Sequence, residues 1–405
     1  MDCADVEKPK STLTFSAGLT KAAADSGRSY FDLLKEIAKL RFSRGRLSFD
    51  DYCGLRLYDN NLYKDADKKA FAGFRVTQKI CLRANYRFDA FGLVNNKTVA
   101  DILLNLYGFP IMPTMAIFRD GIGRKAPFLL KNEDELRTFL INSQHYPLFG
   151  KPVSGCQSIG TASIDHYDAA SRRLITTMGH GMSLDTFVSY VKAHSAYGYI
   201  FQKRVSPHAV VRKLCGDRLA TLRLLTIMTE GKPRLFRACW KIPAGLNTAD
   251  NFWRPGNLLA GLDLDSGRVL RVIRQTGTGF EEITHHPDTG VCIVGTMVPN
   301  WQEITLLALQ GAKLFEEVPL AGWDIAPVDT GTGAVIVEIN EVPDSRLHQL
   351  ADRCGLLDAE FMNFLAERKH HAADWVLKAK EPNRFITELV PQSSVSPHVP
   401  LAKVR

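Results

Sequence analysis

The sequence predicts an α+β fold that follows a helical N-terminal region. Helical periodicity dominates the chain from Tyr30 to about residue 88, where apolar residues recur every three or four positions. From residue 89 on, helices alternate with short apolar runs that have the length and composition of strands. Several of these runs are joined by tight glycine-containing turns, which is typical of hairpins and favours an α+β fold over a regular βαβ arrangement.

The composition is that of a globular protein. The chain has 405 residues, of which 45% are hydrophobic and 23% charged, so it can form a large core or two to three subdomains. No apolar run reaches the roughly 18 residues that span a membrane, and the N-terminus lacks an export signal pattern, so we expect a cytoplasmic protein. Eight cysteines are scattered without a CxxC pair, which argues against a zinc site and a disulfide scaffold.

The formal net charge of +8 favours anionic partners. Basic residues are interspersed with acidic ones, and the sequence shows no RNA-binding signature or recognition helix. We therefore expect no nucleic-acid partner, and we attribute the charge to attraction of nucleotides and acidic small molecules.

The elements of the first part of the chain are expected to be helices after a loose start. Residues 1–28 are polar and are expected to be loose. A first helix is predicted from Tyr30, with a break near Gly45, and its apolar stripe comprises Leu33, Leu34, Ile37 and Leu40. Ser48 followed by Asp50 and Asp51 is a helix start signal, and residues 64–86 are expected to continue as helix.

The remaining elements alternate between helix and strand. Residues 95–118 predict a helix that Gly108 and Pro110 end, followed by a strand. Further helices are predicted over 133–142, 184–194, 301–318 and 358–380, a strand–loop–strand unit over 146–164, a strand over 197–205, and hairpins over 218–242 and 322–344. We expect four segments: a helical region over 1–88, a main domain over 89–355, a C-terminal helix over 356–380 and a disordered tail over 381–405.

The hairpin over 322–344, "GWDIAPVDTGTGAVIVEINEVPD", carries an unusual set of polar residues. A turn centred on Gly331 places Asp324 directly opposite Glu338, although like charges in that position destabilise a sheet. Alternation predicts that Ala334 and Ile336 share a face with Glu338 and Asn340. One interpretation is a solvated sheet face. The other is a site for Mg²⁺ (or Mn²⁺), which prefers carboxylate and amide oxygens together with substrate phosphates.

Two further stretches could bind phosphate. "FGKPVSGCQSIGTASI" places Lys151 at the end of a strand, before a loop that Gly155 and Gly160 bracket, and such loops can bind phosphates through backbone N–H groups. It is not a Walker A loop, because the lysine precedes the loop, and a plain glycine-rich hairpin is the alternative. Arg223 lies inside an apolar strand and needs an anionic partner, either a structural carboxylate or a bound phosphate or carboxylate.

Taken together, these stretches resemble the ATP-grasp superfamily, and within it the sugar-transfer-associated branch related to α-L-glutamate ligases. The resemblance covers roughly residues 30–350 and rests on the order and spacing of "GKPVSGCQSIG", "TLRLLTI", "ADNFWRPGNLLAGLD", "HHPDTGVCIVG", "VPNW" and the 322–344 hairpin. It implies an ATP-grasp fold, in which two α+β subdomains hold ATP between them. Cys156 and Gln157 are bulkier than the residues usual in the glycine-rich loop of that family.

The resemblance also implies roles for individual residues. It implies magnesium ligands at Asp324, Glu338 and Asn340, and catalytic roles for Lys151 and Arg223. It implies nucleotide contacts at Lys151, Ser154, Gly155, Cys156, Gln157, Ser158, Gly160, Gln202, Lys203, Val205 and His208. Candidate substrate residues are Asp250, Asn251, His285 and His286, although the two histidines also fit a loop turn before Pro287.

The implied reaction is an ATP- and Mg²⁺-dependent ligation of a carboxylate and an amine through an acyl phosphate, in polysaccharide or peptide-like metabolite biosynthesis. The expected partners are therefore small-molecule carboxylate and amine substrates. Two alternatives remain open from the sequence: an ATP-dependent phosphotransferase, and a nucleotide-binding protein of polysaccharide assembly that performs no chemistry.

Overall fold

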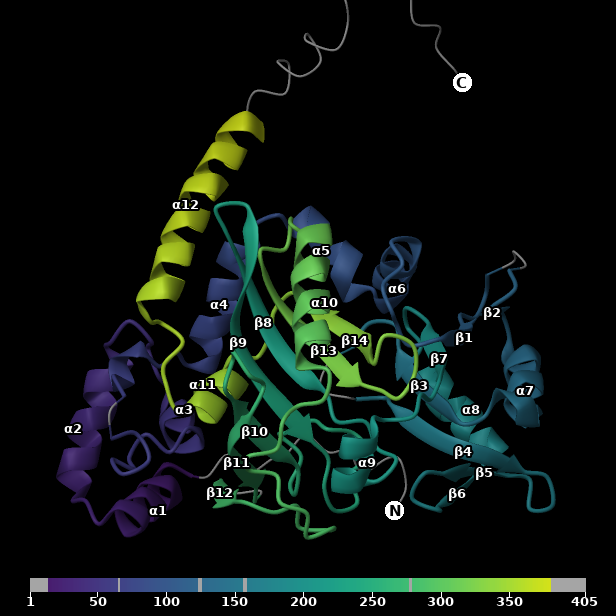
Figure 1. Ribbon diagram of the computed structural model, residues 1–405, viewed down its shortest axis with the longest axis horizontal. Coiled ribbons are helices and arrows are strands. Elements are labelled where there is room, and N and C mark those ends of the chain that lie inside the picture. The colour runs from purple at the N-terminus through teal and green to yellow at the C-terminus, as the bar shows by residue number, and fades with distance from the viewer. Residues whose placement is uncertain (1–13, 65, 123–125, 156–158, 277–278, 380–405) are drawn as a thin grey trace, which may run out of the picture.

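The computed structural model describes residues 14–64, 66–122, 126–155, 159–276 and 279–379. These residues form two seven-stranded sheets with helices on their faces, which confirms the predicted α+β fold class (Figure 1). In spatial order, the first sheet comprises β2 (Leu129–Leu130), β1 (Thr114–Phe118), β7 (Tyr199–Lys203), β3 (Leu148–Pro152), β4 (Ala162–Asp168), β5 (Arg173–Thr176) and β6 (Gly181–Ser183). The second comprises β12 (Phe280–Ile283), β11 (Val269–Gln275), β10 (Leu258–Leu262), β9 (Lys232–Ile242), β8 (Leu222–Thr229), β13 (Leu320–Pro327) and β14 (Ala334–Asn340).

Two helices cover one face of the first sheet. Helices α7 (Glu133–Ile141) and α8 (Leu184–Ala193) pack against its central strands in one apolar cluster, in which the rings of Phe139 and Phe187 contact Phe201. Strands β3 and β4 pair antiparallel and flank the glycine-rich loop, as the sequence predicts. The first sheet therefore carries the loop that is the candidate phosphate site.

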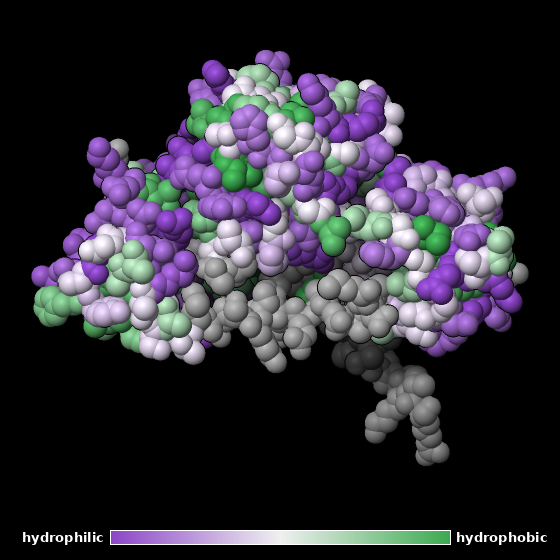
Figure 2. Space-filling model, turned by 90° about the horizontal axis from the view of Figure 1, so that it is seen from below, coloured by the Kyte–Doolittle hydropathy of each residue, from purple (hydrophilic) through white to green (hydrophobic). Residues whose placement is uncertain are grey.

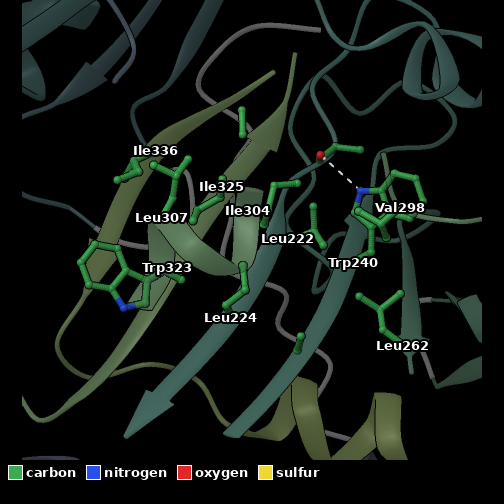
Figure 3. Close-up of a cluster of buried hydrophobic side chains, with 14 of the residues drawn as sticks. Leu222, Leu224, Trp240, Leu262, Val298, Ile304, Leu307, Trp323, Ile325 and Ile336 are labelled. Carbon is green, nitrogen blue, oxygen red and sulfur yellow. Dashed lines mark hydrogen bonds between the residues drawn. The ribbon is translucent and has the colours of Figure 1, made fainter. Parts of the chain in front are cut away.

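Helix α10 (Trp301–Leu314) covers one face of the second sheet. Ile304 and Leu307 of this helix pack against the large core residues Trp240 and Trp323 of the sheet (Figure 3). Truncating a buried tryptophan of this kind to alanine costs about 3–5 kcal/mol of stability. Helices α5 (Phe88–Asn95) and α6 (Lys97–Leu106) contact β14 at the edge of the same sheet.

The opposite face of the second sheet receives α11 (Arg346–Asp352) and the N-terminal helices. Leu347 of α11 and Leu33 of α2 (Tyr30–Arg41) belong to one apolar cluster with Leu259 of β10. In Figure 1 the N-terminal helices lie at the lower left, beside β10 to β12. This face is apolar where helices cover it, and the charged residues of β8, β9, β13 and β14 line a cavity beside the covered part.

The start of the chain is more helical than we expected. Helix α1 (Phe15–Ser26) occupies part of the segment that was expected to be loose, with Thr14 as its N-cap and Gly27 ending it in a left-handed conformation. Its apolar face is mostly alanine, so the periodicity is weak. Helix α3 (Phe49–Gly54) begins at Ser48 through a reciprocal capping box with Asp51, as predicted.

The predicted helix over 64–86 is too long. Only α4 (Phe74–Ala84) is α-helical, and it follows a short 3₁₀ turn at Lys68–Ala70. A Cβ at Gly73 would lie 2.4 Å from Asp51 Oδ2, so the chain passes close to α3 before α4 begins. This tertiary contact, rather than local propensity, separates the turn from the helix.

A β-bulge corrects the predicted faces of the 322–344 hairpin. Asp324 pairs with Glu338 as predicted, but Ile325 pairs with Ile336, so Val337 is an extra residue in β14. Ala334 and Ile336 belong to the apolar core beneath α10, whereas Glu338 and Asn340 line a cavity on the opposite side of the sheet. The prediction that these four side chains share a face is therefore wrong, because a bulge reverses the alternation at that point.

The chain leaves the body of the structure through α12 (Ala359–Ala379), which projects to the upper left in Figure 1. Its first turns pack Phe361 and Phe364 against Leu225 and Phe236 of the second sheet. The expected disordered tail lies outside the described residues. Among the helices described, none combines the length and apolar character that a membrane span needs.

Candidate nucleotide and metal site

A cavity of about 320 Å³ lies between the two sheets, and the charged face of the second sheet forms one of its walls. Lys151 of β3 and Gln202 of β7 line it from the first sheet. From the second sheet, its lining includes Arg223, Lys241, Asp324, Glu338 and Asn340. The cavity thus brings together residues separated by nearly two hundred positions in the sequence.

Four charged side chains lie side by side on this wall, one from each of four adjacent strands. Arg223 of β8 lies directly opposite Asp324 of β13, which in turn lies opposite Glu338 of β14, and Lys241 comes from β9. Across the four strands the order is therefore two cations, Lys241 and Arg223, followed by two carboxylates, Asp324 and Glu338. The repulsion expected between Asp324 and Glu338 is offset because Asp324 turns its charge toward the two cations.

Asp324 is the centre of a buried ion cluster. Arg223 Nε and Nη2 donate to its two oxygens at 2.5 and 2.9 Å, and Lys241 Nζ donates to Oδ2 at 3.1 Å. The three residues are only 3%, 7% and 6% exposed for Asp324, Arg223 and Lys241 respectively. Burial alone would raise the pKa of Asp324, but the charges of Arg223 and Lys241 outweigh it and hold that pKa below its ordinary value. Asp324 is therefore the structural carboxylate partner that was one of the two alternatives for Arg223 from the sequence.

Lys151 approaches the same wall from the first sheet. It is buried, and its ammonium donates to the carbonyl oxygen of Val337, at the bulge, over 3.1 Å. Burial lowers its pKa, and the nearby carboxylates of Asp101 and Glu338 offset this only in part. A cation held in this way, close to a loop that can approach phosphate oxygens, gains stability when an anion enters the cavity.

The glycine-rich loop adjoins Lys151. Gly155 lines the cavity, whereas Ser154 and Gly160 are not among the lining residues. Gly160 has a left-handed backbone (φ 77°), and a Cβ there would lie 2.8 Å from Pro152, so this position requires glycine. Cys156, Gln157 and Ser158 lie outside the described residues, and their assignment to the nucleotide site stays a prediction.

Of the candidate residues at the exit of β7, only Gln202 lines the cavity. Its Nε2 is 3.3 Å from Asp101 Oδ2, and its buried Oε1 has no hydrogen-bond partner within the described chain. Lys203 turns away and donates to the carbonyl oxygen of Tyr146. Val205 packs in a separate apolar cluster, and His208 caps α9 (Ala209–Cys215) by accepting from Val210 N at 3.2 Å.

The candidate substrate residues divide into two groups. Asp250 and Asn251 line the cavity, and Asp250 Oδ2 accepts hydrogen bonds from the backbone N and the hydroxyl of Thr221 at 2.8 and 2.5 Å. His285 and His286 do not line it. His286 is buried with its Nε2 3.0 Å from the carbonyl oxygen of Pro243, and His285 contacts Thr284, which agrees with the loop-turn interpretation of both histidines.

Sequence reasoning missed several charged residues of the cavity, including Lys97, Arg204, Arg218 and Lys241. Lys241 had the same signal as Arg223, because it is a cation inside the apolar run "RACWKI". Burial opposes its charge, but Asp250 and Asp324 outweigh this and raise its pKa. Lys97 gave no such signal, since it opens α6, and only the fold brings its Nζ to 3.8 Å from Glu338 Oε2.

The donor set fits a hard cation at one end of the row of charges. The described residues contain no cluster of three His, Cys, Asp or Glu side chains of the kind that holds a metal by itself. Glu338 and Asn340 nevertheless present a carboxylate and an amide to the cavity, and one or two carboxylates with substrate phosphates suffice for Mg²⁺. Asp324 fits less well as a metal ligand, because Arg223 and Lys241 already neutralise it. Glu338 is therefore the principal charged ligand that this geometry offers.

Comparison with solved structures gives distant matches. The D-alanine-D-alanine ligase from Coxiella burnetii is 12% identical (TM-score 0.40; 73% of this chain and 62% of that chain covered), and VanG D-Ala:D-Ser ligase from Enterococcus faecalis is 13% identical (0.39; 70% and 63%). Biotin carboxylase from Campylobacter jejuni is 10% identical (0.38; 64% and 44%). The chain thus spans less than two thirds of the length of each of these structures.

No curated protein matches the sequence. The family model described as sugar-transfer associated ATP-grasp matches residues 76–363, which is well over half of the chain and includes every strand of both sheets. This chain belongs to the sugar-transfer associated ATP-grasp family.

Proposed function

We propose that the protein is an ATP- and Mg²⁺-dependent ligase that joins a carboxylate to an amine. The observation that carries the proposal is the wall of paired charges, Lys241 and Arg223 beside Asp324 and Glu338, which faces Lys151 across one cavity. Activation of a carboxylate by ATP requires positioning and neutralisation of phosphate charge rather than a protein nucleophile. Family membership supports the same class of reaction.

The residues divide into roles along the cavity. Lys151 and the loop beside Gly155 would bind the ATP phosphates, and Glu338 with Asn340 would hold the magnesium ion, which supplies charge neutralisation between phosphate oxygens. Gln202, whose buried oxygen has no partner among the described residues, would contact the nucleotide at the exit of β7. Ser154, Gly160, Lys203, Val205 and His208 do not line the cavity, so we keep them out of this assignment.

Arg223 and Lys241 would stabilise the anion that forms when the carboxylate attacks the terminal phosphate. Each is already bound to Asp324, which fixes its orientation before substrate enters. Such preorganised charges lower a transition state without reorganisation at the moment of reaction. Asp250 and Asn251 lie at the end of the cavity next to Lys241, where they would bind the acceptor substrate.

The test is a screen of carboxylate and amine pairs with ATP and Mg²⁺, in which ADP and free phosphate are measured separately. A ligase releases equal amounts of both only when the carboxylate and the amine are present together. A phosphotransferase releases ADP without free phosphate, and a nucleotide-binding module shows ATP affinity without turnover. Either of the last two results would overturn the proposal.

A further inference from the structure

The outer face of helix α2 is apolar although no part of the described chain covers it. Phe31 is 75% exposed and Phe42, which caps the helix, is 89% exposed, and Leu34 is exposed between them. Positions 31, 34, 38 and 42 follow helical spacing, so they form one stripe, which we call the outer stripe. The buried stripe of Leu33 and Leu40 lies on the opposite side of the same helix. Figure 2 shows hydrophobic surface at the left end of the molecule, where α1 and α2 lie.

Basic side chains border the outer stripe. Lys35 and Lys39 lie one turn apart beside it, and Arg41 lies at its end. Within the described chain these three have no carboxylate partner, because Glu36 turns inward to Arg28 and Lys68. Lys35 and Lys39 also line a cavity whose carboxylates are Asp32, Glu36 and Asp67. Asp32 accepts a hydrogen bond from Ser29, and Asp67 pairs with Arg44. The acidic side chains near this surface are thus mostly engaged, and the cations are left for a partner.

We infer that the outer stripe of α2 docks on an anionic lipid surface. Exposed aromatic residues with lysines and arginines along their edge are the pattern by which a helix lies in a membrane interface, with rings among the acyl chains and cations at the headgroups. A second copy of the chain is a poor occupant. A symmetric contact through the stripe would bring Lys35, Lys39 and Arg41 of both copies together, and like charges repel.

Docking through the outer stripe does not involve the cavity between the sheets. No residue of the outer stripe lines the cavity between the sheets, so docking would leave that cavity open to solutes. The inference is therefore independent of the proposed ligase chemistry, and its failure would leave that chemistry untouched.

The experiment is vesicle flotation of the full chain. Vesicles of phosphatidylcholine alone are compared with equal mixtures of phosphatidylcholine and phosphatidylglycerol, at low and high salt. We expect recovery with the anionic vesicles only, and less at high salt, because salt screens the lysine contacts. The double variant Phe31→Gln, Phe42→Gln should bind at least about tenfold more weakly, since it removes both inserted rings.

Two controls decide between the stripe and general stickiness. Leu106→Gln with Tyr107→Gln removes a similar pair of exposed apolar side chains at the end of α6, and it should float like the wild type. Lys35→Gln with Lys39→Gln should lose the preference for anionic lipid. The proposal is overturned if the wild type does not float, if both apolar double variants float equally well, or if Phe31→Gln, Phe42→Gln converts a dimer into a monomer. Equal melting temperatures of the variants show that they are folded.

Discussion

Replacing the two facing carboxylates one at a time by their amides should separate folding from metal binding. Asp324→Asn and Glu338→Gln keep shape and remove one negative charge each, at positions directly opposite each other. In Asp324→Asn, Arg223 and Lys241 stay buried without their shared counter-ion. Breaking a buried ion pair in this way costs about 3–5 kcal/mol. That is a large part of the roughly 5–15 kcal/mol by which a folded protein is stable.

Glu338→Gln should cost far less stability. Glu338 is partly exposed, and its nearest cation, Lys97 Nζ, lies 3.8 Å away. Pairs of this kind are worth about 0–1 kcal/mol. The same change should weaken the magnesium-dependent part of ATP binding by at least about tenfold. The reason is that both oxygens of Asp324 are bound by Arg223, whereas the carboxylate of Glu338 faces the cavity and is available to a metal ion.

Urea unfolding measures the first effect, and calorimetric ATP titrations with and without Mg²⁺ measure the second. Glu281→Gln on β12 serves as a control for loss of one acidic charge from the same sheet. The reasoning is refuted if Asp324→Asn unfolds within about 1 kcal/mol of the wild type, since the buried cluster would then not need its carboxylate. It is also refuted if ATP binding by Glu338→Gln depends on Mg²⁺ as strongly as in the wild type, because Glu338 would then be only a solvent-facing residue of the sheet.

Further predictions concern Lys151, Arg223 and the buried carboxyl of Asp101. Lys151→Ala should weaken ATP binding by about tenfold or more, because one charge-assisted contact is worth about 1.5–3 kcal/mol. The ammonium of Lys203 points away from the cavity, so the control variant Lys203→Ala should bind ATP like the wild type. Equal ATP affinities of the two variants would contradict the phosphate role of Lys151. Arg223→Lys should lower the free energy of unfolding, since lysine cannot reproduce the two-pronged contact with Asp324, and should slow single-turnover ligation at least about tenfold per folded molecule; a destabilised but fully active variant would limit Arg223 to a structural role. Burial raises the pKa of Asp101 to about 6, and Lys151 and Lys97 offset this only in part, so the folded state holds this proton more tightly than the unfolded state. Stability from neutral Asp101 is therefore present below about pH 4 and lost as the pH rises through 6. Across this range the urea midpoint of Asp101→Asn should depend less on pH than the midpoint of the wild type. An equal pH dependence of the two proteins would contradict the burial of this carboxyl.

Local sequence patterns were enough to predict many of the elements and part of the candidate site. Periodicity and turn residues located helices α6, α7, α8, α10 and α12 and the β8–β9 and β13–β14 hairpins, because local spacing and glycine turns are properties of short segments. They did not locate the seven-residue helices α9 and α11, which are too short to show a clear apolar period. The cation inside an apolar strand marked Arg223, since a buried charge needs a partner wherever it lies. The order of the motifs indicated the family that the family model then matched.

The set of residues that share the cavity depends on how distant segments pack together. The bulge at Val337 turns Glu338 and Asn340 away from the core, and no local signal in an apolar strand announces an extra residue. Lys97 and Lys241 come to the two carboxylates from different elements, and His285 and His286 lie elsewhere despite their suggestive chemistry. Pairing across strands depends on contacts between segments far apart in the chain, and for this reason spacing along the sequence could not assign Asp324 to its two cations.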